Sequence, residues 1–108
     1  MFFLMVSHAQ AAADAAQGKA KYQQLCVSCH GAAGVGDGAA AAALNPKPRN
    51  LTDATYMKTR TDAQLAKTIK EGGAAVGLSP MMPPWSAALN DQDVANVVAY
   101  LRTLAGGK

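Results

Sequence analysis

The residues best suited to chemistry in this chain stand together: Cys26, Cys29 and His30, in the stretch CVSCH. They include both cysteines and one of the two histidines of a 108-residue chain. On a helix, residues three and four positions apart lie on one face, so these three side chains point to the same side. Two thiols and an imidazole so placed could bind zinc, form a redox pair, form a disulfide or attach a haem.

Three of these chemistries find too little support elsewhere in the sequence. A structural zinc site needs four ligands, and the other histidine, His8, lies in a segment with the character of an export signal. A thioredoxin-like redox pair follows a strand, and no segment alternates apolar and polar residues as strands do. A Cys26–Cys29 disulfide would close a very short loop and constrain little. We therefore favour covalent haem attachment, which the pattern C-x-x-C-H indicates.

A haem iron bound by His30 leaves a second axial position, which the sulfur of a methionine can fill. The methionines beyond residue 11 are Met57, Met81 and Met82. Met82 is followed by Pro-Pro-Trp, and the two prolines stiffen the loop because their rings fix φ. We predict Met82 as the distal ligand, with Met81 as the alternative, and place Met57 in the core, where methionine fills gaps.

Three segments carry the apolar repeat of helices, at about 14–29, 62–71 and 91–104. Asp14 and Asn90 are suited to cap the first and the last. Gly18 inside the first helix suggests that another element crosses close to it. The last helix has the clearest apolar face, formed by Val94, Val97, Val98, Leu101 and Leu104.

Two long irregular stretches, 31–60 and 72–85, separate these helices. Short helical turns are possible at 39–43 and 52–57. Loops of this length are uncommon in a small domain unless they enclose something. The chain also has one tryptophan, three tyrosines and two phenylalanines, and much of its apolar content is alanine. A chain of this size is marginally stable on such a core, and a prosthetic group would add the missing apolar volume.

The charge pattern and residues 1–11 bear on partners and localisation. The net charge is +3 with a pI near 9.0, and the basic residues form no run, which argues against nucleic-acid binding and allows docking to an acidic protein. The apolar run 2–6 and the following Ala-Gln-Ala fit the end of an export signal that starts upstream. A simple N-terminal tail is the alternative, and the run is too short for a membrane anchor. Residues 12–108 form the remaining single domain.

The motif CVSCH, the sequence MPPW at 82–85 and the final amphipathic helix together resemble class I cytochrome c, over about residues 14–105. The resemblance implies an all-α fold in which three main helices and long loops wrap around one covalently bound haem. Cytochromes c′ are less similar, because their haem motif stands near the C-terminus and they lack the methionine. In class I proteins the terminal helices cross at a small residue and an aromatic, which match Gly18, Tyr22, Val97 and Tyr100.

The resemblance also implies roles for residues around the haem. A proline carbonyl after the motif accepts a hydrogen bond from the proximal imidazole, and Pro46 and Pro48 are the candidates. Arg49 could pair with a haem propionate, or be solvated at the surface. Trp85 is expected beside the haem and the methionine loop, or simply in the core.

The function implied by the family is one-electron transfer between larger redox proteins, in the periplasm or at the membrane. The sequence offers no catalytic triad or paired carboxylates, so we expect a monomeric carrier rather than an enzyme. It would meet membranes only through membrane-bound redox complexes. The alternative is a ligand-binding sensor or peroxidase-like haem protein with a labile Met82, motivated by the glycines that precede this residue.

Overall fold

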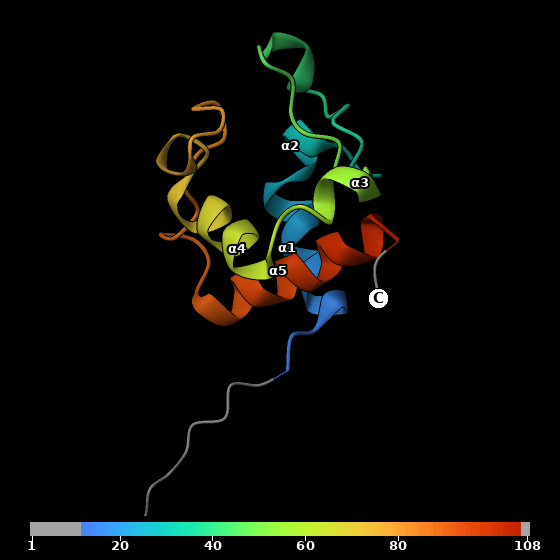
Figure 1. Ribbon diagram of the computed structural model, residues 1–108, viewed down its shortest axis with the longest axis vertical. Coiled ribbons are helices and arrows are strands. Elements are labelled where there is room, and N and C mark those ends of the chain that lie inside the picture. Colours follow the sequence, from blue (N-terminus) through green and yellow to red (C-terminus); the bar gives the residue numbers. More distant parts are fainter. Residues whose placement is uncertain (1–11, 107–108) are drawn as a thin grey trace, which may run out of the picture.

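The computed structural model describes residues 12–106, in which the regular structure is five α-helices and two 3₁₀ turns, with no strand (Figure 1). The α-helices are α1 (Ala15–Leu25), α2 (Val27–His30), α3 (Ala54–Met57), α4 (Asp62–Glu71) and α5 (Asp91–Leu104). The 3₁₀ turns are η1 (Ala41–Ala43) and η2 (Ala74–Val76). The all-helical fold class is therefore confirmed, and its three longest helices lie in the three predicted segments. The predicted export signal, 1–11, lies outside the described residues.

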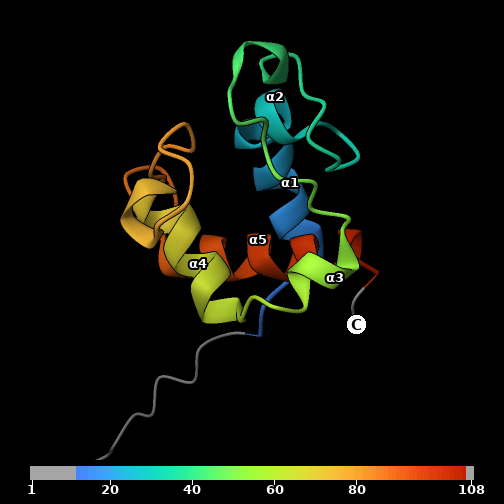
Figure 2. The same cartoon turned by 45° about the horizontal axis from the view of Figure 1, so that its top comes forward.

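The helices α1 and α5 cross in direct contact (Figures 1 and 2). A β-carbon at Gly18 would overlap the carbonyl oxygen of Asn96, so only glycine permits this approach. One turn further along, the rings of Tyr22 and Tyr100 pack with their centroids 5.2 Å apart, tilted by 59°. The Tyr22 hydroxyl donates a 2.6 Å hydrogen bond to the carbonyl of Gly31, the residue that ends α2. The crossing confirms the expectation based on Gly18.

The segment predicted as one helix over 14–29 is helical, but the prediction that it is continuous was wrong, because the helix is interrupted at Cys26. The helix α1 ends at Leu25, and Cys26, with φ −109° and ψ −25°, separates it from α2. The chain still turns tightly there, because the His30 amide donates to the Cys26 carbonyl at 2.9 Å. Asp14 caps α1 as predicted, and its carboxylate accepts from two amides of the first turn.

The starts of α4 and α5 are fixed by local hydrogen bonds. Both have a capping box, formed by Thr61 with Gln64 and by Asn90 with Asp93. In each box the two residues bond reciprocally, because each side-chain oxygen accepts a hydrogen bond from the backbone amide of the other residue. The predicted short turns exist as η1 and as α3, which Asp53 caps.

The core lies where α1, α4 and α5 meet. Its buried residues include Tyr22, Met57, Leu65, Ile69, Val94, Val97, Val98 and Leu101. The two long loops rise from this base on separate sides, 31–53 above α1 and α2 and 72–85 beyond α4 (Figure 2). Among the described residues, no helix is long and apolar enough to cross a membrane.

Candidate functional site

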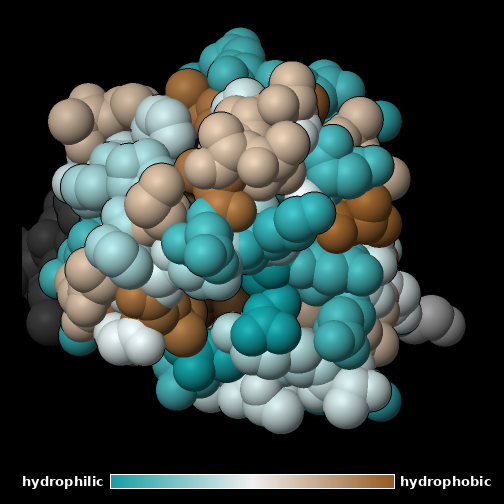
Figure 3. Space-filling model, turned by 90° about the horizontal axis from the view of Figure 1, so that it is seen from above, coloured by the Kyte–Doolittle hydropathy of each residue, from teal (hydrophilic) through white to brown (hydrophobic). Residues whose placement is uncertain are grey.

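A cavity of about 490 Å³ lies between the two loops and the helical base. Its volume is within the range of roughly 300–1,000 Å³ found for cofactor sites. All seven predicted site residues line it: Cys26, Cys29, His30, Pro48, Arg49, Met82 and Trp85. The upper face of the molecule shows apolar side chains exposed among polar ones (Figure 3), and Leu78 and Met81, which also line the cavity, are 39% and 46% exposed.

Cys26 and Cys29 are half-buried free thiols on one wall of the cavity. Burial, with a smaller contribution from the neighbouring Cys29, raises the pKa of the Cys26 thiol to about 11. A redox-active or nucleophilic cysteine requires the opposite shift, toward a stable thiolate. The environment of Cys26 therefore argues against thiol redox chemistry at this residue.

His30 projects from the end of α2, and its Nδ1 lies 3.1 Å from the carbonyl oxygen of Arg49. Burial lowers the pKa of this imidazole, and the hydrogen bond to Arg49 acts in the opposite direction. The carbonyl can only accept, so Nδ1 carries the proton and Nε2 keeps its lone pair. A neutral imidazole whose Nδ1–H is fixed by a backbone carbonyl is a typical metal ligand.

The expectation that Pro46 or Pro48 accepts this hydrogen bond was wrong. Both prolines line the cavity, but the accepting carbonyl belongs to the next residue, Arg49. The Pro48 carbonyl instead faces Gly36, where an added β-carbon would lie 2.6 Å from its oxygen. Successive carbonyls of an extended chain point in opposite directions, so only one of the two can face His30.

The side chain of Arg49 lies over the ring of Tyr56, with the guanidinium carbon 3.8 Å from the ring centroid. This cation–π contact holds the charge at the cavity, which both residues line. Lys47 and Arg60 are the other charged residues among those described that line it. A cavity edged by cations and without carboxylates suits a ligand that carries acidic groups, as the propionates of a haem do.

Three methionines line the cavity and differ in exposure. Met57 is 1% exposed and belongs to the core, as predicted, whereas Met81 is 46% exposed. Met82 lies between these extremes and packs against the core. Its carbonyl accepts a 3.0 Å hydrogen bond from the amide of Gly73, which fastens the loop to the end of α4. Met82 thus has its backbone fixed and its side chain toward the core.

Trp85 is half-buried, packs against the core and lines the cavity. Its amide donates to the carbonyl of Ile69 in the last turn of α4 at 2.9 Å. Together the donor set consists of two thiols for attachment, an imidazole, thioethers and an apolar wall with cations at its edge. These residues fit a covalently attached haem.

Residues 15–105 match the model of the cytochrome c family. The chain belongs to the cytochrome c family. The family implies one covalently attached haem c, and the helical architecture of the chain is that of class I cytochromes c.

Relatives include both small cytochromes and larger subunits. Cytochrome c-554(547) of Halothiobacillus neapolitanus is 36% identical over 95 residues, which cover 86% of this chain and 99% of that protein. The cbb3-type cytochrome c oxidase subunit FixP of Bradyrhizobium diazoefficiens is 34% identical over 95 residues, which cover 88% of this chain. This chain spans only 29% of that subunit.

Solved structures show the same fold. A chain of the Kuenenia stuttgartiensis reducing HAO-like protein complex is similar over 87% of this cytochrome and 44% of its own length, with a TM-score of 0.69 and 28% identity. Cytochrome cL of Methylophaga aminisulfidivorans gives a TM-score of 0.62 at 24% identity, over 86% of this chain and 56% of its own.

The sequence did not predict Tyr56 or Arg60 as part of the site. Both lie in the long stretch 31–60, which has no periodic pattern to indicate which side chains face inward. The seven-residue spacing of Arg49 and Tyr56 does not predict their contact, because only the folded loop places the guanidinium over the ring.

Proposed function

We propose that this cytochrome is a one-electron carrier rather than an enzyme, with its haem iron bound by His30 and Met82. The observation that carries the proposal is that these two residues, 52 positions apart in sequence, line the same cavity. A bound haem supplies reversible one-electron chemistry, and filling both axial positions prevents substrate coordination.

The residues of the chain divide the remaining work. Cys26 and Cys29 tether the group, and the Arg49 carbonyl orients His30 through its Nδ1 proton. The apolar walls, to which buried Met57 and half-buried Trp85 contribute, limit the access of water. Ligands held in the same place in both oxidation states lower the reorganisation that electron transfer requires.

For the cellular setting, we propose an exported monomer that shuttles electrons between redox proteins in the periplasm or at the membrane. Cytochrome c-554(547), matched over 99% of its length, supports this arrangement, since one such domain suffices for a cytochrome. The oxidase subunits provide the rival arrangement, a domain within a larger assembly. Expression of the chain in a bacterium that matures c-type cytochromes, followed by fractionation and size determination, distinguishes the two. Haem protein retained in the cytoplasm or in large assemblies would contradict the proposal.

Absorption spectroscopy tests the axial ligands directly. We expect the ferric protein to show the weak near-infrared band of a methionine–iron bond and the reduced protein to bind carbon monoxide slowly. A high-spin ferric spectrum without this band, together with rapid carbon monoxide binding, would instead identify the ligand-binding or peroxidase-like alternative.

A further inference from the structure

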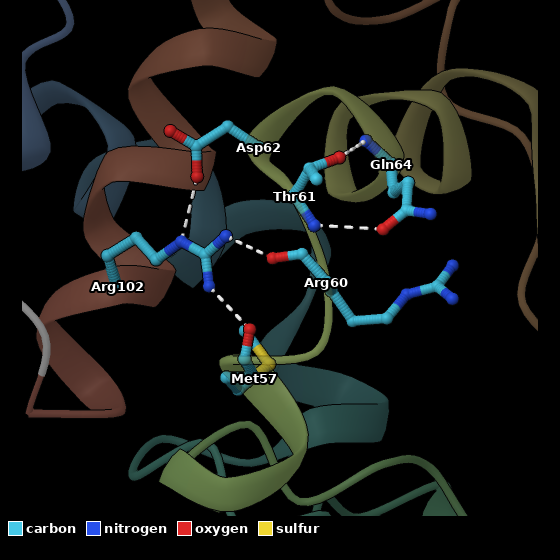
Figure 4. A network of polar contacts seen from close by, with 6 residues as sticks. All are labelled: Met57, Arg60, Thr61, Asp62, Gln64 and Arg102. Carbon is cyan, nitrogen blue, oxygen red and sulfur yellow. Dashed lines mark hydrogen bonds and ion pairs between the residues drawn. The ribbon is translucent and has the colours of Figure 1, made fainter.

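The side chain of Arg102, near the end of α5, donates a hydrogen bond from each of its three nitrogens (Figure 4). Nε donates to Oδ1 of Asp62 at 2.8 Å. Nη1 and Nη2 donate to the carbonyls of Met57 at 2.8 Å and Arg60 at 2.6 Å. The Arg102 side chain is 24% exposed and its bonds to the two carbonyls are partly buried, whereas Asp62 is 75% exposed.

The three acceptors lie on one short turn. Met57 ends α3, and its carbonyl also accepts from the Arg60 amide at 3.2 Å. Arg60 precedes the N-cap of α4, and Asp62 is the first residue of that helix. Arg102 therefore fastens the whole turn between α3 and α4 to α5. Met57 and Arg60 also line the haem cavity, so the turn is part of its wall.

The other end of α4 holds the loop that carries Met82. The Gly73 amide donates to the Met82 carbonyl at 3.0 Å, and the Trp85 amide donates to the Ile69 carbonyl at 2.9 Å. The helix α4 is thus fixed to Arg102 at its start and to the Met82 loop at its end. A displacement of its first turn is transmitted to the loop, because a ten-residue helix moves as a unit.

We propose that Arg102 is a positioning residue for the haem site, which keeps α4 and the Met82 loop closed over the cavity. The inference rests on the proposed ligation by His30 and Met82 and adds a residue that touches neither ligand. Without Arg102, the turn between α3 and α4 loses three bonds to α5. The cavity then opens locally on its Met82 side before the rest of the molecule unfolds.

Arg102→Gln, made in the haem-loaded protein, tests this inference. We expect carbon monoxide to bind the reduced variant about tenfold faster, which corresponds to about 1.4 kcal/mol, and the near-infrared methionine band to weaken. The matched control is Lys70→Met, which cuts the other ion pair between α4 and α5. Lys70 and Asp91 are 2.7 Å apart, but their side chains are 40% and 74% exposed, so the control should change the rate less than twofold.

Hydrogen exchange provides a readout that does not depend on Met82 ligation. The Gly73 amide, relative to the Val97 amide in the core of α5, should exchange about tenfold faster in Arg102→Gln and not in Lys70→Met. If Arg102→Gln fails to mature, Arg102→Lys replaces it, because one ammonium cannot reach three acceptors. If the ratio of the Gly73 to the Val97 exchange rate is the same in the Arg102 variant as in the wild type, the proposed role of Arg102 is overturned. A wild-type spectrum without the methionine band refutes instead the proposed ligation.

Discussion

Nδ1 of His30 and the carbonyl oxygen of Arg49 lie 3.1 Å apart, and this hydrogen bond fixes which ring nitrogen is free to bind iron. The bond links α2 to a loop 19 residues away. The Pro48 carbonyl of this loop packs closely against Gly36, whose φ is +90°. The approach is possible because Gly36 has no β-carbon. The hydrogen bond to His30 therefore depends on the absence of a side chain at Gly36.

Gly36→Ala is expected to raise the reduction potential by roughly 20–60 mV. The added methyl group would lie 2.6 Å from the Pro48 carbonyl oxygen, so the Pro48–Arg49 backbone must shift, which disturbs the geometry of the Nδ1 hydrogen bond and weakens it. A less basic imidazole stabilises ferric iron less, so reduction becomes easier. The size of the potential shift assumes that the ferric state loses about 0.5–1.5 kcal/mol of hydrogen-bond stabilisation and the ferrous state loses none. For a one-electron couple this energy converts to the stated range in millivolts. Potentiometric titration measures the shift.

Gly106→Ala is the control for this experiment. Gly106 also has positive φ, at +70°, but a β-carbon there meets nothing within 4 Å. Both variants should lose about 1 kcal/mol of stability from strain at positive φ. Gly36→Ala should lose more than this because its methyl group meets the Pro48 carbonyl, and only Gly36→Ala should change the potential. Equal potentials in the two variants would show that the Arg49 carbonyl does not tune the iron.

Tyr22→Phe should destabilise the protein by about 1–2 kcal/mol at pH 7, because the Gly31 carbonyl loses its buried partner. The variant should also be less sensitive to alkali. Burial, then the proximity of Cys26, raises the pKa of Tyr22 well above its ordinary value near 10. The unfolded chain releases this proton near pH 10 while the folded chain retains it, so this stability is present below pH 10 and lost above it.

Urea unfolding between pH 7 and pH 11 measures both effects. Tyr100→Phe is the control, since Tyr100 stacks on Tyr22 but is only half-buried. A Tyr22→Phe variant whose stability falls as steeply above pH 10 as that of the wild type would contradict the explanation.

The elements that the sequence predicted well are those determined by neighbouring residues. The caps Asp14 and Asn90 act on residues two or three positions away, and the face of α5 needs only its own repeat. Likewise CVSCH indicates haem attachment from adjacent residues alone, whereas the ligand predicted from MPPW stays a prediction. Local patterns of this kind were sufficient for the fold class and for the haem.

The features that the sequence missed depend on contacts between distant segments or on backbone direction. The break at Cys26 has no glycine or proline to mark it. Whether Pro48 or Arg49 faces His30 depends on a carbonyl, which has no sequence signature. A basic residue such as Arg102 is typical of the last turn of a helix, so its position in the sequence is ordinary. Its hydrogen-bond partners lie 40 to 45 residues away, and no local pattern predicts them.

Gly18→Ala should destabilise the protein by about 2–3 kcal/mol, because the methyl group overlaps the Asn96 carbonyl and forces α1 away from α5. Denaturant unfolding of the haem-loaded protein measures the change. Ala20→Ser, on the exposed part of the same helix, is the control and should stay within about 0.5 kcal/mol of the wild type. A mild effect at Gly18 would mean that the helix crossing adapts more easily than its geometry indicates.

Met82→Ala is expected to leave the haem attached, lower the reduction potential and open the iron to carbon monoxide. Thioether sulfur favours ferrous iron, so its loss should lower the potential by on the order of 0.1 V, within the roughly 0.8 V range that axial ligands span. Met81→Ala and Met57→Leu are the controls, because all three methionines line the cavity. Met81 is largely exposed and Met57 is buried in the core, so neither replacement should remove the near-infrared band. Loss of the band in Met81→Ala and its retention in Met82→Ala would assign the iron to Met81 instead.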